Sequence, residues 1–107
     1  MESNLANQNN PTLNGLVHTF GLSGYPTVTF QIEGTFSAGN YTPQVSNDAT
    51  VWGNIPAVKS DGTSSATVNA AGLYRCDVNG YQLWRLNPSS DIAAVCSVIS
   101  IASPLAL

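Results

Sequence analysis

The stretch that decides the fold class is TVTFQIEGTF, residues 27–36. Within it the apolar side chains of Val28, Phe30 and Ile32 alternate with polar ones until Gly34 interrupts the pattern. Successive side chains of a β-strand point to opposite faces, so this period of two predicts a strand with one buried face.

The same signal recurs on both sides of this stretch. Extended or alternating segments are expected at residues 17–22, 40–45, 51–55, 73–78, 81–86 and 93–101. Turn residues separate them, and Asp61-Gly62 and Asn79-Gly80 are strong hairpin signals. No stretch has the periodicity of an amphipathic helix. The sequence therefore predicts an all-β chain, an antiparallel β-sandwich of Ig-like or jelly-roll-like type with about seven or eight short strands.

In such a sandwich the core is built from side chains that share the inward phase of their strands. The expected members are Val28, Phe30, Ile32, Trp52, Tyr74, Val78, Trp84, Leu86, Ile99 and Ile101. The same phase points Cys76 inward and Cys96 outward, so no bridge between them is expected. The chain starts without a basic and apolar signal peptide, which favours two reduced thiols.

The N-terminal residues differ in composition from the rest. Residues 1–15 are rich in Asn and Gln, so we expect an extended N-terminal arm without its own fold. Residues 16–107 then form the β-sandwich domain. Leu5, Pro11 and Leu13 give the arm apolar points with which it can contact a neighbouring chain.

Charge is scarce in this sequence. Only 8% of the 107 residues are charged, and the net charge is −3. Lys59, Arg75 and Arg85 are scattered, which argues against nucleic acid and against anionic membranes as partners. Serines and Pro104 interrupt the longest apolar stretch, residues 92–107, so no transmembrane span is expected. A weakly charged polar surface suits a subunit packed against neighbours, because buried charges are costly. An ordinary β-domain rich in Ser and Thr fits the composition equally well.

Residues that could carry out chemistry are few and isolated. His18 is the single histidine and lies in an alternating segment, where a structural role is expected. The acidic residues are separated along the chain, and Cys76 is expected in the core, where thiols are inert. We therefore expect no catalytic residue, no metal site, no cofactor and no enzymatic activity. Tyr41 and Trp52 are the aromatic residues expected to contact a partner or a glycan.

The most distinctive segment is AGLYRCDVNGYQ, residues 71–82, followed by Trp84-Arg85. Together with residues 28–36 and the turn at residues 61–63, it resembles the β-sandwich structural domains of tailed-phage virion proteins, of the head decoration (cement) or head-fibre type. The resemblance covers about three-quarters of the chain and implies a structural role without enzymatic activity. This sequence departs from the pattern at Pro43 and at both cysteines.

The leading hypothesis is a capsid decoration or cement protein that binds the outer head surface and stabilises the shell. It would be made in the host cytoplasm and would bind the major capsid protein or another virion protein, as a homo-oligomer with a trimer favoured. A tail, neck or fibre-attachment component is the first alternative. A glycan-binding module on the virion surface is the second.

Overall fold

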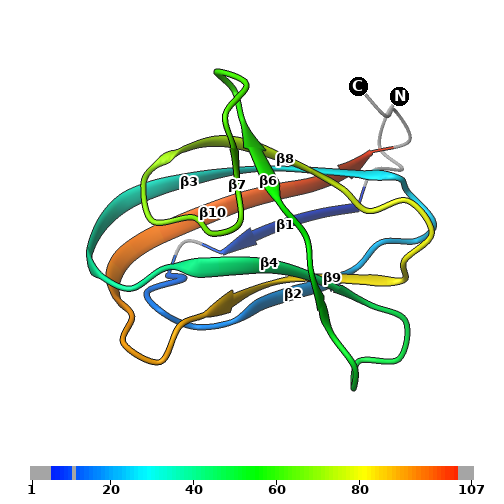
Figure 1. Ribbon diagram of the computed structural model, residues 1–107, viewed down its shortest axis with the longest axis horizontal. Coiled ribbons are helices and arrows are strands. Elements are labelled where there is room, and N and C mark those ends of the chain that lie inside the picture. The colour runs from blue at the N-terminus through cyan, green and yellow to red at the C-terminus, as the bar shows by residue number, and fades with distance from the viewer. Residues whose placement is uncertain (1–5, 11, 104–107) are drawn as a thin grey trace.

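Strands β3 (Thr27–Ala38) and β10 (Ala93–Ser103) are the longest in the chain and pair antiparallel along their whole length. In the computed structural model, which describes residues 6–10 and 12–103, this pair lies inside a six-stranded sheet (Figure 1). The segment that predicted a strand from its alternation is thus the spine of the larger sheet. Its buried positions, Val28, Phe30 and Ile32, are the ones expected.

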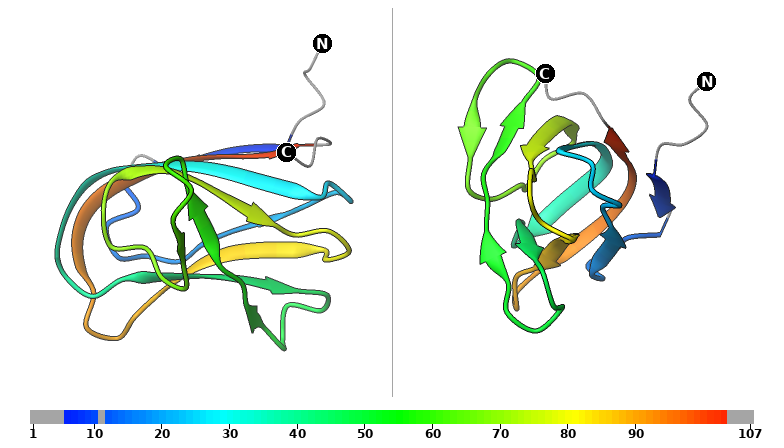
Figure 2. Two further views of the ribbon diagram at one scale, coloured as in Figure 1. Left: turned by 45° about the horizontal axis from the view of Figure 1, so that its top comes forward. Right: turned by 90° about the vertical axis from the view of Figure 1, so that its right-hand side faces the viewer.

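Eight shorter strands complete two sheets. They are β1 (Ala6–Asn10), β2 (His18–Gly21), β4 (Tyr41–Ser46), β5 (Gly53–Asn54), β6 (Ala57–Lys59), β7 (Ser64–Ser65), β8 (Gly72–Asp77) and β9 (Leu83–Pro88). The six-stranded sheet has the order β1-β10-β3-β8-β6-β7, and the four-stranded sheet has the order β2-β9-β4-β5. The two sheets lie over one another as layers (Figure 2).

The expected all-β antiparallel sandwich is confirmed. The strands of the described residues outnumber the expected seven or eight, because β5 and β7 are only two residues long and β1 lies in the predicted arm. None of the described residues belongs to a helix that could cross a membrane.

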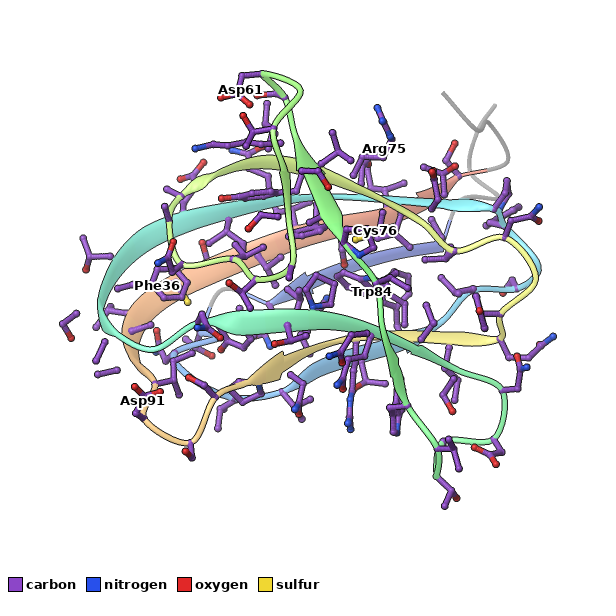
Figure 3. All side chains as sticks on the ribbon, in the orientation of Figure 1. Phe36, Asp61, Arg75, Cys76, Trp84 and Asp91 are labelled. Carbon is purple, nitrogen blue, oxygen red and sulfur yellow. The ribbon has the colours of Figure 1, made fainter. Side chains whose placement is uncertain are left out.

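Trp84 from β9 lies at the centre of the core and is fully buried (Figure 3). Its ring centroid is 5.3 Å from that of Phe30 in the opposite sheet and 5.6 Å from that of Phe20 on β2. His18 meets the same indole at 6.1 Å in an edge-on arrangement. Tilted and edge-on packing of this kind adds to the stabilisation from apolar burial.

The predicted phase of the last strand is wrong. Cys96, Val98, Ser100 and Ala102 face the core, whereas Val95 and Ile99 are 72% and 47% exposed and Ile101 is half-buried. The strand is apolar on both faces, so alternation alone does not select the inward one. Small side chains face inward where the large rings of the core already fill the space.

Trp52, expected in the core, lies instead on the outer face of the four-stranded sheet. Its ring covers the guanidinium of Arg85, whose Cζ is 4.1 Å from the ring centroid. Trp52 is the last residue of an irregular loop, residues 47–52, and does not lie in a regular strand, so strand periodicity does not apply to it.

The predicted arm is partly built into the sandwich. Residues 6–10 form strand β1, which pairs with β10 from Ala6 opposite Ala102 to Asn10 opposite Val98. Leu13 is fully buried in the core. The expectation of an arm without its own fold is therefore wrong for these residues, because an unpaired edge of β10 offers backbone partners that composition does not show. The domain boundary at residue 15 stays a prediction.

The two predicted hairpin turns have different outcomes. Asp61-Gly62 joins β6 to β7 as expected, with the Lys59 amide donating to the Thr63 carbonyl at 2.8 Å. Asn79-Gly80 also forms a turn, but it links β8 of the larger sheet to β9 of the smaller one. The prediction of a turn at Asn79-Gly80 is confirmed, but the prediction that the strands on either side of it pair as a hairpin is wrong.

At Gly34 the backbone of β10 lies so close to β3 that no side chain fits. Its φ is +132°, and a Cβ there would lie 2.6 Å from the Cα of Cys96 and still closer to the Val95 carbonyl oxygen. Both obstacles are backbone atoms of the central strand pair, which cannot move without disturbing the register.

We predict that Gly34→Ala lowers the free energy of unfolding by about 3 kcal/mol or more, through steric overlap and an unfavourable φ. The measurement is the urea-unfolding midpoint of the purified chain. Gly21→Ala is the matched control, because a Cβ at Gly21 meets no atom within 4 Å. Equal midpoints for the two variants would contradict the prediction.

Candidate binding surfaces

The outer face of the six-stranded sheet carries exposed apolar side chains. Leu73, Val95 and Ile99 are 53%, 72% and 47% exposed and all point away from the other sheet. Strand β10 is thus apolar on both faces, a composition typical of strands covered on both sides. An exposed apolar face of this kind indicates a contact site for another molecule.

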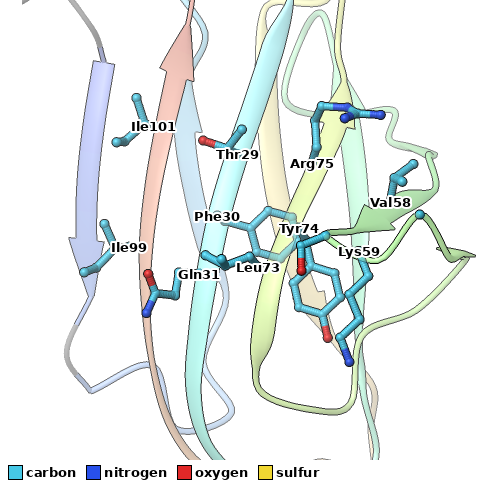
Figure 4. Close-up of a pocket in the computed structure, with 12 residues that line it drawn as sticks. Thr29, Phe30, Gln31, Val58, Lys59, Leu73, Tyr74, Arg75, Ile99 and Ile101 are labelled. Carbon is cyan, nitrogen blue, oxygen red and sulfur yellow. The ribbon is translucent and has the colours of Figure 1, made fainter. Parts of the chain in front are cut away.

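Cross-strand register arranges these side chains in rows. One row consists of Ile99, Gln31 and Leu73, contributed by β10, β3 and β8. The next row begins with Ile101, Thr29 and Arg75 and reaches Val58 on β6. Figure 4 shows both rows on the same face.

A groove of about 500 Å³ runs over these rows. Lys59, Ser60 and Gly62, at the end of β6 and in the turn that follows, line it together with the two rows. We call this surface the sheet-face groove. Its floor is a pleated sheet of apolar and neutral polar side chains, which suits a broad, shallow contact better than an enclosed ligand.

Charges lie within and beside the sheet-face groove. Arg75 and Lys59 are lining residues, and Glu33 lies next to the groove on β3, where its carboxylate accepts a hydrogen bond from the amide nitrogen of Gln31. In the turn after β6, the Thr63 amide donates to Asp61 and, with the charge of Lys59, holds the pKa of that carboxyl below its usual range. The surface can therefore recognise a charged partner as well as an apolar one.

The outer face of the four-stranded sheet carries a second, smaller cluster around Arg85. Its Nε donates to Gln44 Oε1 at 2.8 Å, and Gln44 Nε2 donates to Asn54 Oδ1 at 2.7 Å. Trp52 covers the guanidinium and donates its own Nε1–H to the carbonyl of Ala49 at 3.2 Å. We call these four side chains the Trp52 cluster.

The structure separates the residues expected to contact a partner. Leu5 and Pro11 lie outside the described residues. Leu13 and Tyr41 are fully buried, and the Tyr41 hydroxyl donates to the Leu16 carbonyl at 2.9 Å. Of the three that the structure describes, only Trp52 has a side chain that is accessible at the surface. Partner contact by any of them stays a prediction.

Sequence reasoning missed the exposed apolar residues of the larger sheet. The predicted core includes Ile99, and the predicted strand at residues 73–78 begins at Leu73 without assigning that side chain to a face. The available signal was residues 93–102, in which apolar residues occur at both odd and even positions. A strand with apolar residues in both phases predicts apolar side chains on both faces of its sheet.

The histidine and both cysteines lie in the buried interior. His18 Nε2 and Ser100 Oγ are 2.8 Å apart, and burial lowers the pKa of His18 from 6.5. Burial likewise raises the pKa of Cys76 to about 12, and Cys96 is buried as well. Across residues 6–10 and 12–103, no three histidine, cysteine or acidic side chains come together as a metal site.

Sequence comparison finds no matching protein family and no matching curated protein. Two solved structures share the fold. The SPBc2 prophage-derived protein YomS superposes with a TM-score of 0.69 at 11% identity, over 94% of this chain and 96% of YomS. The PBSX exported protein XepA gives 0.73 at 14% identity, over 95% of this chain but only 39% of XepA. At these identities the likeness shows the fold alone.

We predict that His18 makes the fold sensitive to mild acid. The pKa of His18 is lowered in the folded chain, so below pH 6.5 the unfolded chain binds a proton that the folded chain excludes until its own lower pKa is reached. Stability is therefore complete above this range and falls as the pH decreases through it.

Thermal unfolding at about pH 7.5 and about pH 5 measures this effect, because ordinary carboxyl groups titrate mainly below that window. The wild-type melting temperature should drop more between the two conditions than that of His18→Gln, which keeps a polar side chain but has no proton to gain. An equal drop in both proteins would refute the assignment.

Proposed function

We propose that this chain is a structural virion protein of a tailed bacteriophage, and in particular a capsid decoration protein that binds the outer surface of the head. The observation that carries the proposal is the exposed apolar face of the six-stranded sheet. A surface of this kind binds other proteins, and the described residues form no cluster of catalytic groups beside it.

Two further observations support the phage assignment. The fold extends over 96% of a prophage-derived protein, so a chain of this architecture and size occurs in a phage genome as a nearly complete protein. The segment 72–81, which resembles virion domains, forms β8 and the turn to β9, and so contributes Leu73 and Arg75 to the sheet-face groove.

The mechanism of such a protein is binding alone. A chain that binds the assembled lattice more tightly than its separate subunits shifts the equilibrium toward the lattice. Neutral polar side chains and a few apolar ones on a rigid sheet support this role, because little conformational entropy is lost when an ordered face is covered.

Particles purified from the phage that encodes this chain test the proposal. Cryo-electron microscopy should show its density on the outer head at a copy number that follows the capsid lattice. Density confined to the tail or neck would favour the alternative component instead, and absence from the particles would overturn the virion assignment.

Binding to purified heads tests the surface itself. Leu73→Glu places a charge in the sheet-face groove and should weaken binding by about tenfold or more, since an unpaired charge is costly to bury in an interface. Thr19→Glu, on the exposed side of β2 in the other sheet, is the control and should bind as the wild type does. Equal binding by both variants would exclude this face.

A glycan-binding role is the second candidate, and the Trp52 cluster is the observation that favours it. An indole beside amide side chains provides the stacking and hydrogen-bonding groups that sugars use. A glycan array with the wild-type chain and Trp52→Ala tests it. Binding that is lost in the variant would support the role, and an array without signal would remove it.

A further inference from the structure

We infer that the outer face of the six-stranded sheet binds the same face of a second copy of this chain, around a two-fold axis that lies along the row Ile99–Gln31–Leu73. The inference rests on the proposed binding role of this surface and deepens it by naming an occupant: a second copy covers in the free chain the face that the head would cover in a particle. It does not depend on where in a particle the chain is found.

The first argument is the composition of the central row. Ile99 and Leu73 are about half exposed on the strands that flank β3, and Gln31 lies between them at the same level of the sheet. In a two-fold interface each surface must be complementary to itself. Each residue on the axis meets its own copy, so Ile99 and Leu73 make apolar contacts. Gln31 meets a second Gln31, and the two side-chain amides can pair because an amide both donates and accepts hydrogen bonds.

The second argument is the position of the charges on either side of that row. Strands β3 and β8 are antiparallel, so Glu33, two residues beyond Gln31, and Arg75, two residues beyond Leu73, lie on opposite sides of the row. A two-fold rotation about the row exchanges its two sides. It therefore brings Arg75 of one copy over Glu33 of the other, and the ion pair forms twice.

The same arrangement fits the way sheets pack. Glu33 and Arg75 are on neighbouring strands, so the axis must tilt slightly from the perpendicular to the strands. Such a tilt crosses the two sheets, as packed sheets do at about 30°. Asp77 lies two residues beyond Arg75 on β8. The rotation places it opposite Thr35 of the other copy, a neutral side chain that does not repel it.

Charge density also favours a second copy as the occupant. Only 8% of the residues are charged, so two copies with the same net charge of −3 repel one another weakly. Most of the face is neutral, and Glu33 and Arg75, each two residues from the central row and on opposite sides of it, have opposite signs.

The test is sedimentation velocity of the purified full chain over a range of concentrations. The wild type should form a dimer. Glu33→Arg and Arg75→Glu should each weaken the dimer by about tenfold or more, because each places like charges opposite one another. The double variant, Glu33→Arg with Arg75→Glu, should recover dimerisation, since the ion pairs then re-form with reversed polarity.

Asp91→Arg is the control for net charge, because Asp91 lies in the turn between β9 and β10, away from this face. It should dimerise as the wild type does. Circular dichroism and thermal melts establish that every variant is folded. The double variant also guards against a folding defect, since rescue requires both single changes to be tolerated.

Three outcomes would overturn the inference. They are a wild type that stays monomeric, a larger oligomer such as the trimer favoured by the sequence, and a dimer unaffected by the single reversals or not recovered in the double variant. These results are independent of the particle experiments. If the chain binds heads as a monomer, the proposed function stands and the inference fails. If the chain forms the dimer but is absent from particles, the inference stands and the proposed function fails.

Discussion

The packing of Trp84 between the two sheets is the constraint from which the outer surface follows. The indole is fully buried and meets Phe30, Phe20 and His18 in tilted or edge-on contacts. With these rings filling the centre, the inward positions of β10 near them are small, and Ser100 provides the partner of His18. The two isoleucines of that strand, Ile99 and Ile101, consequently lie on its outer side.

The apolar outer face is therefore a consequence of how the core is filled. A strand such as β10, which is apolar on both sides, gains stability from burying one face during folding and leaves the other face available for contact with another molecule. The core needs the exclusion of a side chain at Gly34 to keep β3 and β10 in register. The same register sets which side chains share a row on the outer face, so the core and the candidate interface depend on a single alignment of two strands.

The groups of this architecture that are available for recognition lie on its surfaces. Both thiols and the imidazole are buried, and the pKa shifts of Cys76 and His18 arise from burial, which suits structural groups better than reactive ones. The exposed groups are apolar side chains, amides and a few charges spread over flat sheet faces. Such groups recognise another protein by shape and register, and the proposals of virion assembly and self-association both draw on that property.

The sequence by itself determined the fold class, because alternation in β3 and turn residues between strands are local signals that do not depend on the partner strand. It also located the inward faces of β3, β8 and β9 correctly at Phe30, Tyr74 and Trp84. Only the tertiary structure decided the inward face of β10, the half-buried position of Trp52 on the outer face of the smaller sheet and the inclusion of residues 6–10 as an edge strand. Each of these depends on contacts between segments distant in the chain, such as Ser100 with His18 or Arg85 with Trp52. Where both faces of a strand are apolar, periodicity cannot choose between them, and the volume left by the opposite sheet makes the choice.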